Sequence, residues 1–148
     1  MPTPEQNKEL IDRFAKEVFE NKNLEYAAGW LSDDFVEHQV FPGTTPDRQG
    51  ALDSYEILFE ASPDMRVEIR EIIAEGDRVA IRATYSGTDK GGFIPGMPAT
   101  GRWYQMDAMY FVRVNDEGKI AEQWGILDTF GTLGQLGLLP SLGEAPLG

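Results

Sequence analysis

The sequence has no cysteine and only one histidine, His38. The absence of cysteine excludes disulfides, thiolate metal sites and a cysteine nucleophile, and it is typical of a reducing compartment, so we expect a cytoplasmic protein. With one imidazole and no thiolate, a transition-metal site would have to consist almost wholly of carboxylates. We therefore expect no bound metal.

Long apolar runs and an excess of basic residues are also missing. No run approaches the ~20 residues that a membrane-spanning helix needs, and the segment from Met1 to Glu5 lacks the basic and apolar regions of a signal peptide. Thirteen Lys and Arg residues oppose twenty-five Asp and Glu residues, which gives a net charge of −12. This charge repels phosphate backbones and anionic membranes. We expect no nucleic acid and no membrane as partners, but a neutral or small ligand, or another protein.

The residues that are present have globular proportions. Hydrophobic residues make up 41% and charged residues 26% of the 148 positions, which argues against disorder. Two independent cores in a chain of this length would each be undersized. We expect a single domain over 1–148, with its core over about 5–140 and a loose tail over 141–148.

Helical patterns occupy the first part of the chain. Thr3 and Gln6 have the spacing of a capping box around Pro4, which suits the first position of a helix. Apolar residues then recur at helical spacing in three segments. Helices are therefore predicted over about 4–20, 24–31 and 51–61.

Strand patterns and turn signals occupy most of the remainder. After a brief extended piece over 34–40, alternating apolar residues predict strands over about 67–74, 78–87, 103–114 and 119–128. Hairpin turns are predicted over 75–77 and 115–118, a long loop over 88–101, and a short terminal helix over 129–139. Helices followed by hairpin-linked strands indicate an α+β fold, in which the helices lie on an antiparallel sheet.

The strand over 103–114 is apolar on both faces. One face carries Trp103, Met109 and Phe111, and the other carries Tyr104, Met106, Tyr110 and Val112. A sheet with one solvated face alternates more cleanly than this. We expect both faces to be covered, one by a second subunit in a homodimer or higher homo-oligomer and the other by an apolar or aromatic ligand in a pocket.

The last hairpin allows an estimate of which residues face one another. A four-residue connection over 115–118 would place Asp128 opposite Gln105, with an indole strip beside them that includes Trp124. In an apolar cleft, the pKa of the Asp128 carboxyl would rise to a value useful for proton transfer. The alternative is that Asp128 caps the terminal helix. The same register pairs Ile126 with Asp107 and Trp124 with Met109.

Other candidate residues also suit purely structural roles. His38 is the side chain whose unperturbed pKa lies near neutrality, yet it also suits a hydrogen bond at a strand edge. Tyr104, like the tryptophan at position 124, suits either the core or a ligand platform. Arg82 suits either a substrate or an ion pair with Glu122 or Asp107.

Several short segments follow one another in a specific order and spacing. They include Phe35-Val36-Glu37-His38-Gln39, Ser62-Pro63-Asp64, Glu75-Gly76-Asp77-Arg78-Val79, Gly118-Lys119-Ile120 and Trp124-Gly125-Ile126-Leu127-Asp128. Over about residues 5–140, this order resembles that of the SnoaL-like polyketide cyclases, or ester cyclases, of the nuclear-transport-factor-2-like superfamily.

The resemblance implies a fold and an activity. The fold is a cone-shaped α+β architecture, in which about three N-terminal helices and a short C-terminal helix accompany a curved antiparallel sheet around an apolar pocket. Characterised members close a ring in a polyketide ester by intramolecular aldol condensation without a cofactor. Their acid/base aspartate ends a Trp-x-x-x-Asp pattern that Asp128 matches, and His38 matches a common histidine. On this hypothesis the substrate stacks on Trp124, Tyr104 and Phe35.

Further roles and rival functions follow from the same hypothesis. Gln105 or His38 would donate a hydrogen bond to a substrate oxygen. Isomerase, dehydratase or epoxide hydrolase chemistry in the same cone would need a second polar group, for which Asp107, Glu122 and Arg82 are candidates. Two rival functions involve no chemistry at all: a non-catalytic small-molecule-binding protein, and a dimerisation module without a pocket.

Overall fold

The computed structural model describes residues 2–92 and 96–139, so the predicted loose tail over 141–148 lies outside the described residues. Over these residues the helices are α1 (Pro4–Ala15), the π-helical segment η1 (Lys16–Glu20), α2 (Leu24–Trp30), α3 (Arg48–Ala61) and α4 (Thr129–Gln135). The strands are β1 (Leu31–Glu37), β2 (Arg66–Glu75), β3 (Arg78–Thr88), β4 (Trp103–Val114) and β5 (Ile120–Leu127). The predicted α+β class with a short C-terminal helix is confirmed.

The N-terminal helices begin where their capping side chains predict. The Thr3 hydroxyl accepts a hydrogen bond from the Gln6 amide at 3.2 Å, and the Gln6 side chain accepts one from the Thr3 amide at 2.9 Å. The Asn23 side chain caps α2 through the amide of Tyr26. The third helix begins three residues before the predicted position because the Asp47 side chain accepts a hydrogen bond from the Gly50 amide.

The five strands form one sheet in the order β1-β5-β4-β3-β2. The pairs from β2 to β5 are antiparallel, as predicted, but β1 joins β5 in a parallel direction. The sheet is therefore mixed, not wholly antiparallel. Local patterns cannot report this direction, because β1 pairs with residues more than 80 positions further along the chain.

The register of the last hairpin differs from the prediction by two residues. Phe111 lies opposite Trp124, and Met109 lies opposite Ile126. One residue of the difference arises at the turn, because Val114 pairs with Ile120 and not with Lys119, and a bulge between Arg113 and Val114 adds the second. A shift of two residues preserves the faces of a strand, so the residues predicted to share a face do share it.

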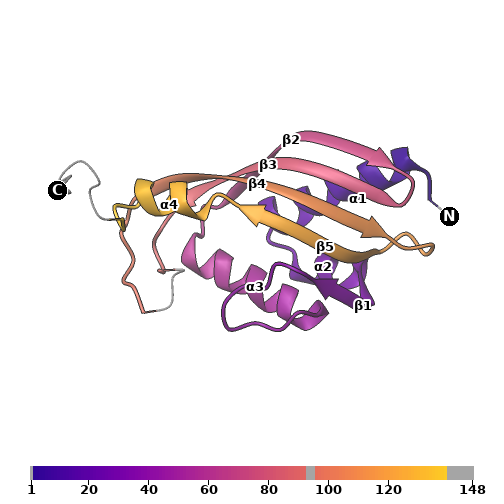
Figure 1. The fold of residues 1–148 in the computed structure, drawn as a ribbon. Helices are drawn as coiled ribbons and strands as arrows, with labels where there is room; N and C mark the ends of the chain where they lie inside the picture. The colour runs from indigo at the N-terminus through magenta and orange to yellow at the C-terminus, as the bar shows by residue number, and fades with distance from the viewer. Residues whose placement is uncertain (1, 93–95, 140–148) are drawn as a thin grey trace, which may run out of the picture.

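Helices α1, α2 and α3 lie on one side of the curved sheet (Figure 1). Val79, Ala83 and Val112 of the sheet pack with Val18 and Ala27 of the helical layer in the main hydrophobic cluster. We call the side of the sheet that faces these helices the inner face and the opposite side the outer face. Among the described residues, no helix combines the length and the apolar character that crossing a membrane requires.

Candidate active site

An apolar pocket of about 500 Å³ lies between the inner face of the sheet and the helices. Its walls include Phe14 of α1, Leu58 of α3, Ile81 of β3 and Met106 of β4. The volume is in the range of pockets that enclose small organic ligands. The face of β4 that carries Tyr104, Met106, Tyr110 and Val112 lines this pocket. The predicted site residues Gln105 and Trp124 belong to the opposite face.

A carboxyl group faces this apolar space from β1. The pairing of β1 with β5 places Glu37 beside Gln123, and both residues line the pocket. One Glu37 carboxyl oxygen accepts a hydrogen bond from the Gln39 amide at 3.0 Å, and the other accepts one from Gln123 Nε2 at 3.0 Å. Only 9% of Glu37 is exposed. The carboxyl group is thus held in a defined orientation and largely removed from water.

Burial governs the protonation of this carboxyl group. Desolvation raises the pKa of Glu37 from 4.5 to about 7, because burial penalises the charged form. The hydrogen bonds from Gln39 and Gln123, together with the charge of His38, act in the opposite direction and are outweighed. Near neutral pH, Glu37 can therefore both accept and release a proton.

Tyrosine side chains from three elements line the same pocket. The Tyr110 hydroxyl donates a hydrogen bond to the Tyr85 hydroxyl at 3.1 Å, and Tyr55 of α3 lies among the lining residues. Burial raises the pKa of Tyr85 to about 12 and raises the pKa of Tyr55 and of Tyr110 as well. The charge of Glu37 contributes to all three shifts. These hydroxyl groups stay neutral and can serve as hydrogen-bond donors.

Gly125 leaves space for the side chains of Tyr110 and Gln39. A Cβ atom at this position would lie 2.5 Å from Cδ1 of Tyr110 and 2.6 Å from Oε1 of Gln39. Both contacts are closer than side-chain atoms tolerate. The missing side chain therefore leaves room beside β5 for the Tyr110 ring and the Gln39 amide.

Asp128 does not occupy the predicted position in the pocket. It directly follows β5, is exposed, and caps α4 by accepting a hydrogen bond from the Gly131 amide at 2.9 Å. Leu127 lines the pocket, and Asp128 comes directly after it. The buried setting expected for this carboxyl group is wrong, and the capping role is confirmed.

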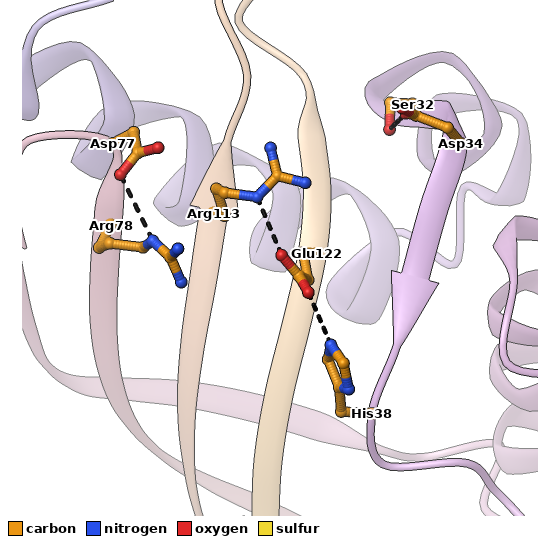
Figure 2. A network of polar contacts seen from close by, with 7 residues as sticks. All are labelled: Ser32, Asp34, His38, Asp77, Arg78, Arg113 and Glu122. Carbon is orange, nitrogen blue, oxygen red and sulfur yellow. Dashed lines mark hydrogen bonds and ion pairs between the residues drawn. The ribbon is translucent and has the colours of Figure 1, made fainter.

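His38 and Trp124 also lie away from the pocket, on the outer face. His38 Nε2 is 2.7 Å from an oxygen of Glu122, whose other oxygen accepts a hydrogen bond from Arg113 Nε at 2.9 Å (Figure 2). These two contacts hold the pKa of Glu122 below its usual value. The His38 ring stacks on Trp124 with 4.6 Å between ring centroids. Two roles were predicted for His38, one catalytic and one structural. The structure shows the structural one, a hydrogen bond at a strand edge.

Three more predicted site residues lie on the outer face. Gln105 is exposed, and its backbone exchanges hydrogen bonds with the Gln135 side chain of α4. Asp107 accepts a hydrogen bond from the Thr84 hydroxyl at 2.9 Å. Arg82 pairs with Glu71 at 3.5 Å, not with Glu122 or Asp107 as predicted. None of these three lines the pocket among the described residues.

Tyr104 and Phe35, the two remaining residues predicted to contact the substrate, are both buried, but only one of them lines the pocket. Tyr104 lines it, and the hydroxyl groups of Tyr104 and Ser62 lie 2.8 Å apart. Phe35 is buried in the hydrophobic core and is not part of the pocket wall. Phe35 and Glu37 are both buried along β1, two positions apart. This alternation was a signal in the sequence that Glu37 faces inward.

No group of three or more His, Cys, Asp or Glu side chains within 2–92 and 96–139 is placed to hold a metal ion. The described lining of the pocket supplies hydrogen-bonding and acid/base groups. It combines one carboxyl group that titrates near neutrality, neutral hydroxyl donors and apolar walls.

The chain is similar to proteins of one family. A family model described as SnoaL-like polyketide cyclase matches residues 9–136. The solved structure of IdmH from Streptomyces antibioticus, described as a proposed polyketide cyclase, is 33% identical over 89% of this chain and 99% of that one, with a TM-score of 0.76. AclR from Streptomyces galilaeus, described as a proposed hydroxylase, is 26% identical over 94% of this chain and 89% of that one, with a TM-score of 0.79.

A further structure agrees in fold alone. TsrD from Streptomyces laurentii is 22% identical over 94% of this chain and 100% of that one, with a TM-score of 0.83. No curated protein matches the chain significantly. The structural matches confirm the predicted cone-shaped fold of the nuclear-transport-factor-2-like type.

Proposed function

Because the chain belongs to the SnoaL-like polyketide cyclase family, we propose that it closes a ring in a polyketide ester by intramolecular aldol-type condensation without a cofactor. We further propose that Glu37, and not Asp128, transfers the proton. One observation carries this assignment: the Glu37 carboxyl group lines the apolar pocket and has a pKa raised to about 7. A general acid/base works best when its pKa is near the pH of the reaction.

The proposed reaction returns its proton. The Glu37 carboxylate removes a proton from the substrate carbon that lies between two carbonyl groups, which leaves an enolate. The enolate carbon attacks a second carbonyl carbon, a carbon–carbon bond forms, and the electron pair of that carbonyl moves to its oxygen. Protonated Glu37 then gives its proton to this alkoxide. The product has the same atoms as the substrate, and no oxidant or reductant takes part.

The tyrosine pair suits the oxygen atoms of this substrate. Because Tyr110 donates its hydroxyl hydrogen to Tyr85, the Tyr85 hydroxyl can donate its own hydrogen to a substrate carbonyl. A donor placed where negative charge develops stabilises the enolate, especially where water is excluded. Gln123 and the Gln39 amide hold the carboxyl group in place, so its reorientation does not slow proton transfer.

The pocket walls favour a neutral substrate. Glu37 is the one acidic side chain among the described lining residues, and none of them is Lys, Arg or His. A substrate carboxylate would lose its hydration there without gaining a cation. An ester would be accommodated, and apolar contact would hold its reacting carbons at attack distance.

The test is turnover of a polyketide ester that carries a 1,3-dicarbonyl group, followed by the appearance of the cyclised product. Glu37→Gln keeps the shape of the side chain and removes its acid/base function, so kcat should fall by about 10²–10⁴. Asp128→Asn, the matched substitution on the outside of the pocket, should leave kcat nearly unchanged. A large loss in Asp128→Asn with normal turnover in Glu37→Gln would refute the assignment. Tight ligand binding with no turnover would identify a binding protein.

A further inference from the structure

The Glu37 carboxyl group faces the pocket without a basic side chain of the protein beside it. None of the described lining residues is Lys, Arg or His. His38 follows Glu37 directly, but its ring lies on the outer face, where Nε2 is 2.7 Å from an oxygen of Glu122 (Figure 2). Arg113 binds the other oxygen of Glu122 at 2.9 Å. Both of these basic side chains therefore bind Glu122 and not Glu37.

The Glu37 carboxyl group also keeps acceptor capacity for a ligand. Its two oxygens accept one hydrogen bond each, from the Gln39 amide and from Gln123 Nε2, both at 3.0 Å. An ionised carboxylate has about four lone-pair sites, so about two stay available. Both donors are uncharged, so they satisfy lone pairs of the carboxylate without neutralising its charge.

Aromatic rings line the same space. Phe14, Phe19, Tyr55 and Tyr85 are all part of the pocket wall. The ring centroid of Phe19 lies 5.4 Å from that of Tyr55 and 5.4 Å from that of Tyr85, in edge-to-face arrangements. The charge of Glu37 acts on both tyrosines, so the carboxyl group is within electrostatic range of these rings. The faces of aromatic rings attract cations, and ammonium groups are often recognised in this way.

We propose that the pocket binds small apolar amines in their ammonium form, with the ammonium group beside Glu37 and the apolar part against the aromatic rings. The fold has already removed Glu37 from water, so binding adds the desolvation cost of the ligand alone. Opposite charges attract strongly where water is excluded, and an N–H of an ammonium group makes a charge-assisted hydrogen bond to a carboxylate. The net charge of −12 also attracts cations to the molecule.

Binding of an ammonium group depends on the ionisation of Glu37. Below its pKa of about 7, Glu37 must first release its proton, so the affinity should fall about tenfold for each further pH unit. The other titratable groups that act on Glu37 do not reverse this trend. Tyr55, Tyr85 and Tyr110 stay neutral because burial raises their pKa values, and the charge of His38 favours ionised Glu37, as an ammonium group does.

An apolar amine of this kind would occupy the pocket without reacting, because it has no carbon between two carbonyl groups. It would compete with the ester and hold the Glu37 carboxylate away from proton transfer. This inhibition rests on the proposed function, whereas the binding itself rests only on the pocket and its carboxyl group. A direct binding measurement therefore tests the inference whether or not an ester is turned over.

The test compares two probes of matched size and shape by calorimetry, 2-(2-naphthyl)ethylamine and 2-(2-naphthyl)ethanol. At pH 8 the amine is protonated, and the wild type should bind it at least roughly tenfold more tightly than the alcohol, because hydrogen bonds between charged groups are the stronger ones. At pH 5 this preference should be lost. Glu37→Gln should lack the preference at pH 8 and still bind the alcohol, which shows that its pocket is intact. The matched control is Glu71→Gln, which changes an exposed glutamate and should keep the preference.

Each other outcome refutes a defined part of this reasoning. Equal affinity of the wild type for the two probes at pH 8, or no binding of either, would overturn the proposal. So would a preference that persists in Glu37→Gln, or one that is the same at pH 5 and pH 8. A wild-type protein that prefers the amine but converts no ester would refute the proposed cyclisation and leave the ammonium site in place.

Discussion

Replacement of Glu37 by glutamine should change how the stability of the fold depends on pH. The carboxyl group has a pKa of about 7 in the folded protein and an ordinary value of 4.5 when exposed. Each unit of difference corresponds to 1.36 kcal/mol between the two states. Ionised Glu37 is therefore expected to lower the free energy of unfolding by roughly 3 kcal/mol at pH values above 7.

The sign of this effect depends on whether the folded or the unfolded protein binds the Glu37 proton more strongly. Below pH 4.5, Glu37 is protonated in both the folded and the unfolded protein, and its burial carries no penalty for charge. As the pH rises from 4.5 to about 7, the unfolded chain ionises first and is stabilised relative to the folded state. Glu37 thus makes the free energy of unfolding fall over this interval. Above pH 7, Glu37 causes no further change.

Urea unfolding between pH 4.5 and 8 measures the effect. In the wild type, the free energy of unfolding should fall over this range by roughly 3 kcal/mol more than in Glu37→Gln. Glu122→Gln is the matched control, because His38 and Arg113 lower the pKa of Glu122 from 4.5, so the contribution of Glu122 to stability changes only below this pH range. Glu122 stabilises the fold above its ordinary pKa and loses this effect as the pH falls. Parallel stability curves for the wild type and Glu37→Gln would show that Glu37 is not buried as a neutral acid.

Three further substitutions test the geometry. Asp128→Ala should lower the free energy of unfolding by about 1 kcal/mol, because α4 loses its N-cap, while ligand binding in the pocket measured by calorimetry stays unchanged. Gly125→Ala should destabilise the fold by about 1–3 kcal/mol in urea and weaken ligand binding, because its Cβ would meet Tyr110 and Gln39. Tyr110→Phe should cost about 1 kcal/mol in the same urea assay through its lost hydroxyl bond, and it should also lower kcat.

Much of the fold could be predicted from the sequence, because local chemistry determines where its elements begin and end. The Thr3 capping box, the Asn23 cap and the turns over 75–77 and 115–118 involve residues within a few positions of one another. The parallel pairing of β1 with β5 depends instead on distant packing. The π-helical turn over Lys16–Glu20 has no comparable local signal.

The candidate site was harder to predict because both faces of the sheet are apolar. Strand alternation correctly grouped Trp124 and Ile126 on one face, and Asp128 lies just beyond the end of β5. It could not indicate whether that face or the opposite one would turn toward the helices. Only the packing of α1, α2 and α3 decides this, and they cover the face that carries Tyr110. The grouping by alternation was therefore correct, but the pocket was assigned to the wrong face of the sheet. The catalytic prediction for Asp128 depended on that assignment.

Where β1 pairs with β5, consecutive residues of each strand face opposite sides of the sheet. Glu37 and Gln123 meet in the pocket, while their immediate neighbours His38 and Trp124 stack on the outer face. A single peptide unit joins each inner residue to its outer neighbour, and the charge of His38 already lowers the pKa of Glu37. The outer face can thus influence proton transfer in the pocket without contributing an atom to it.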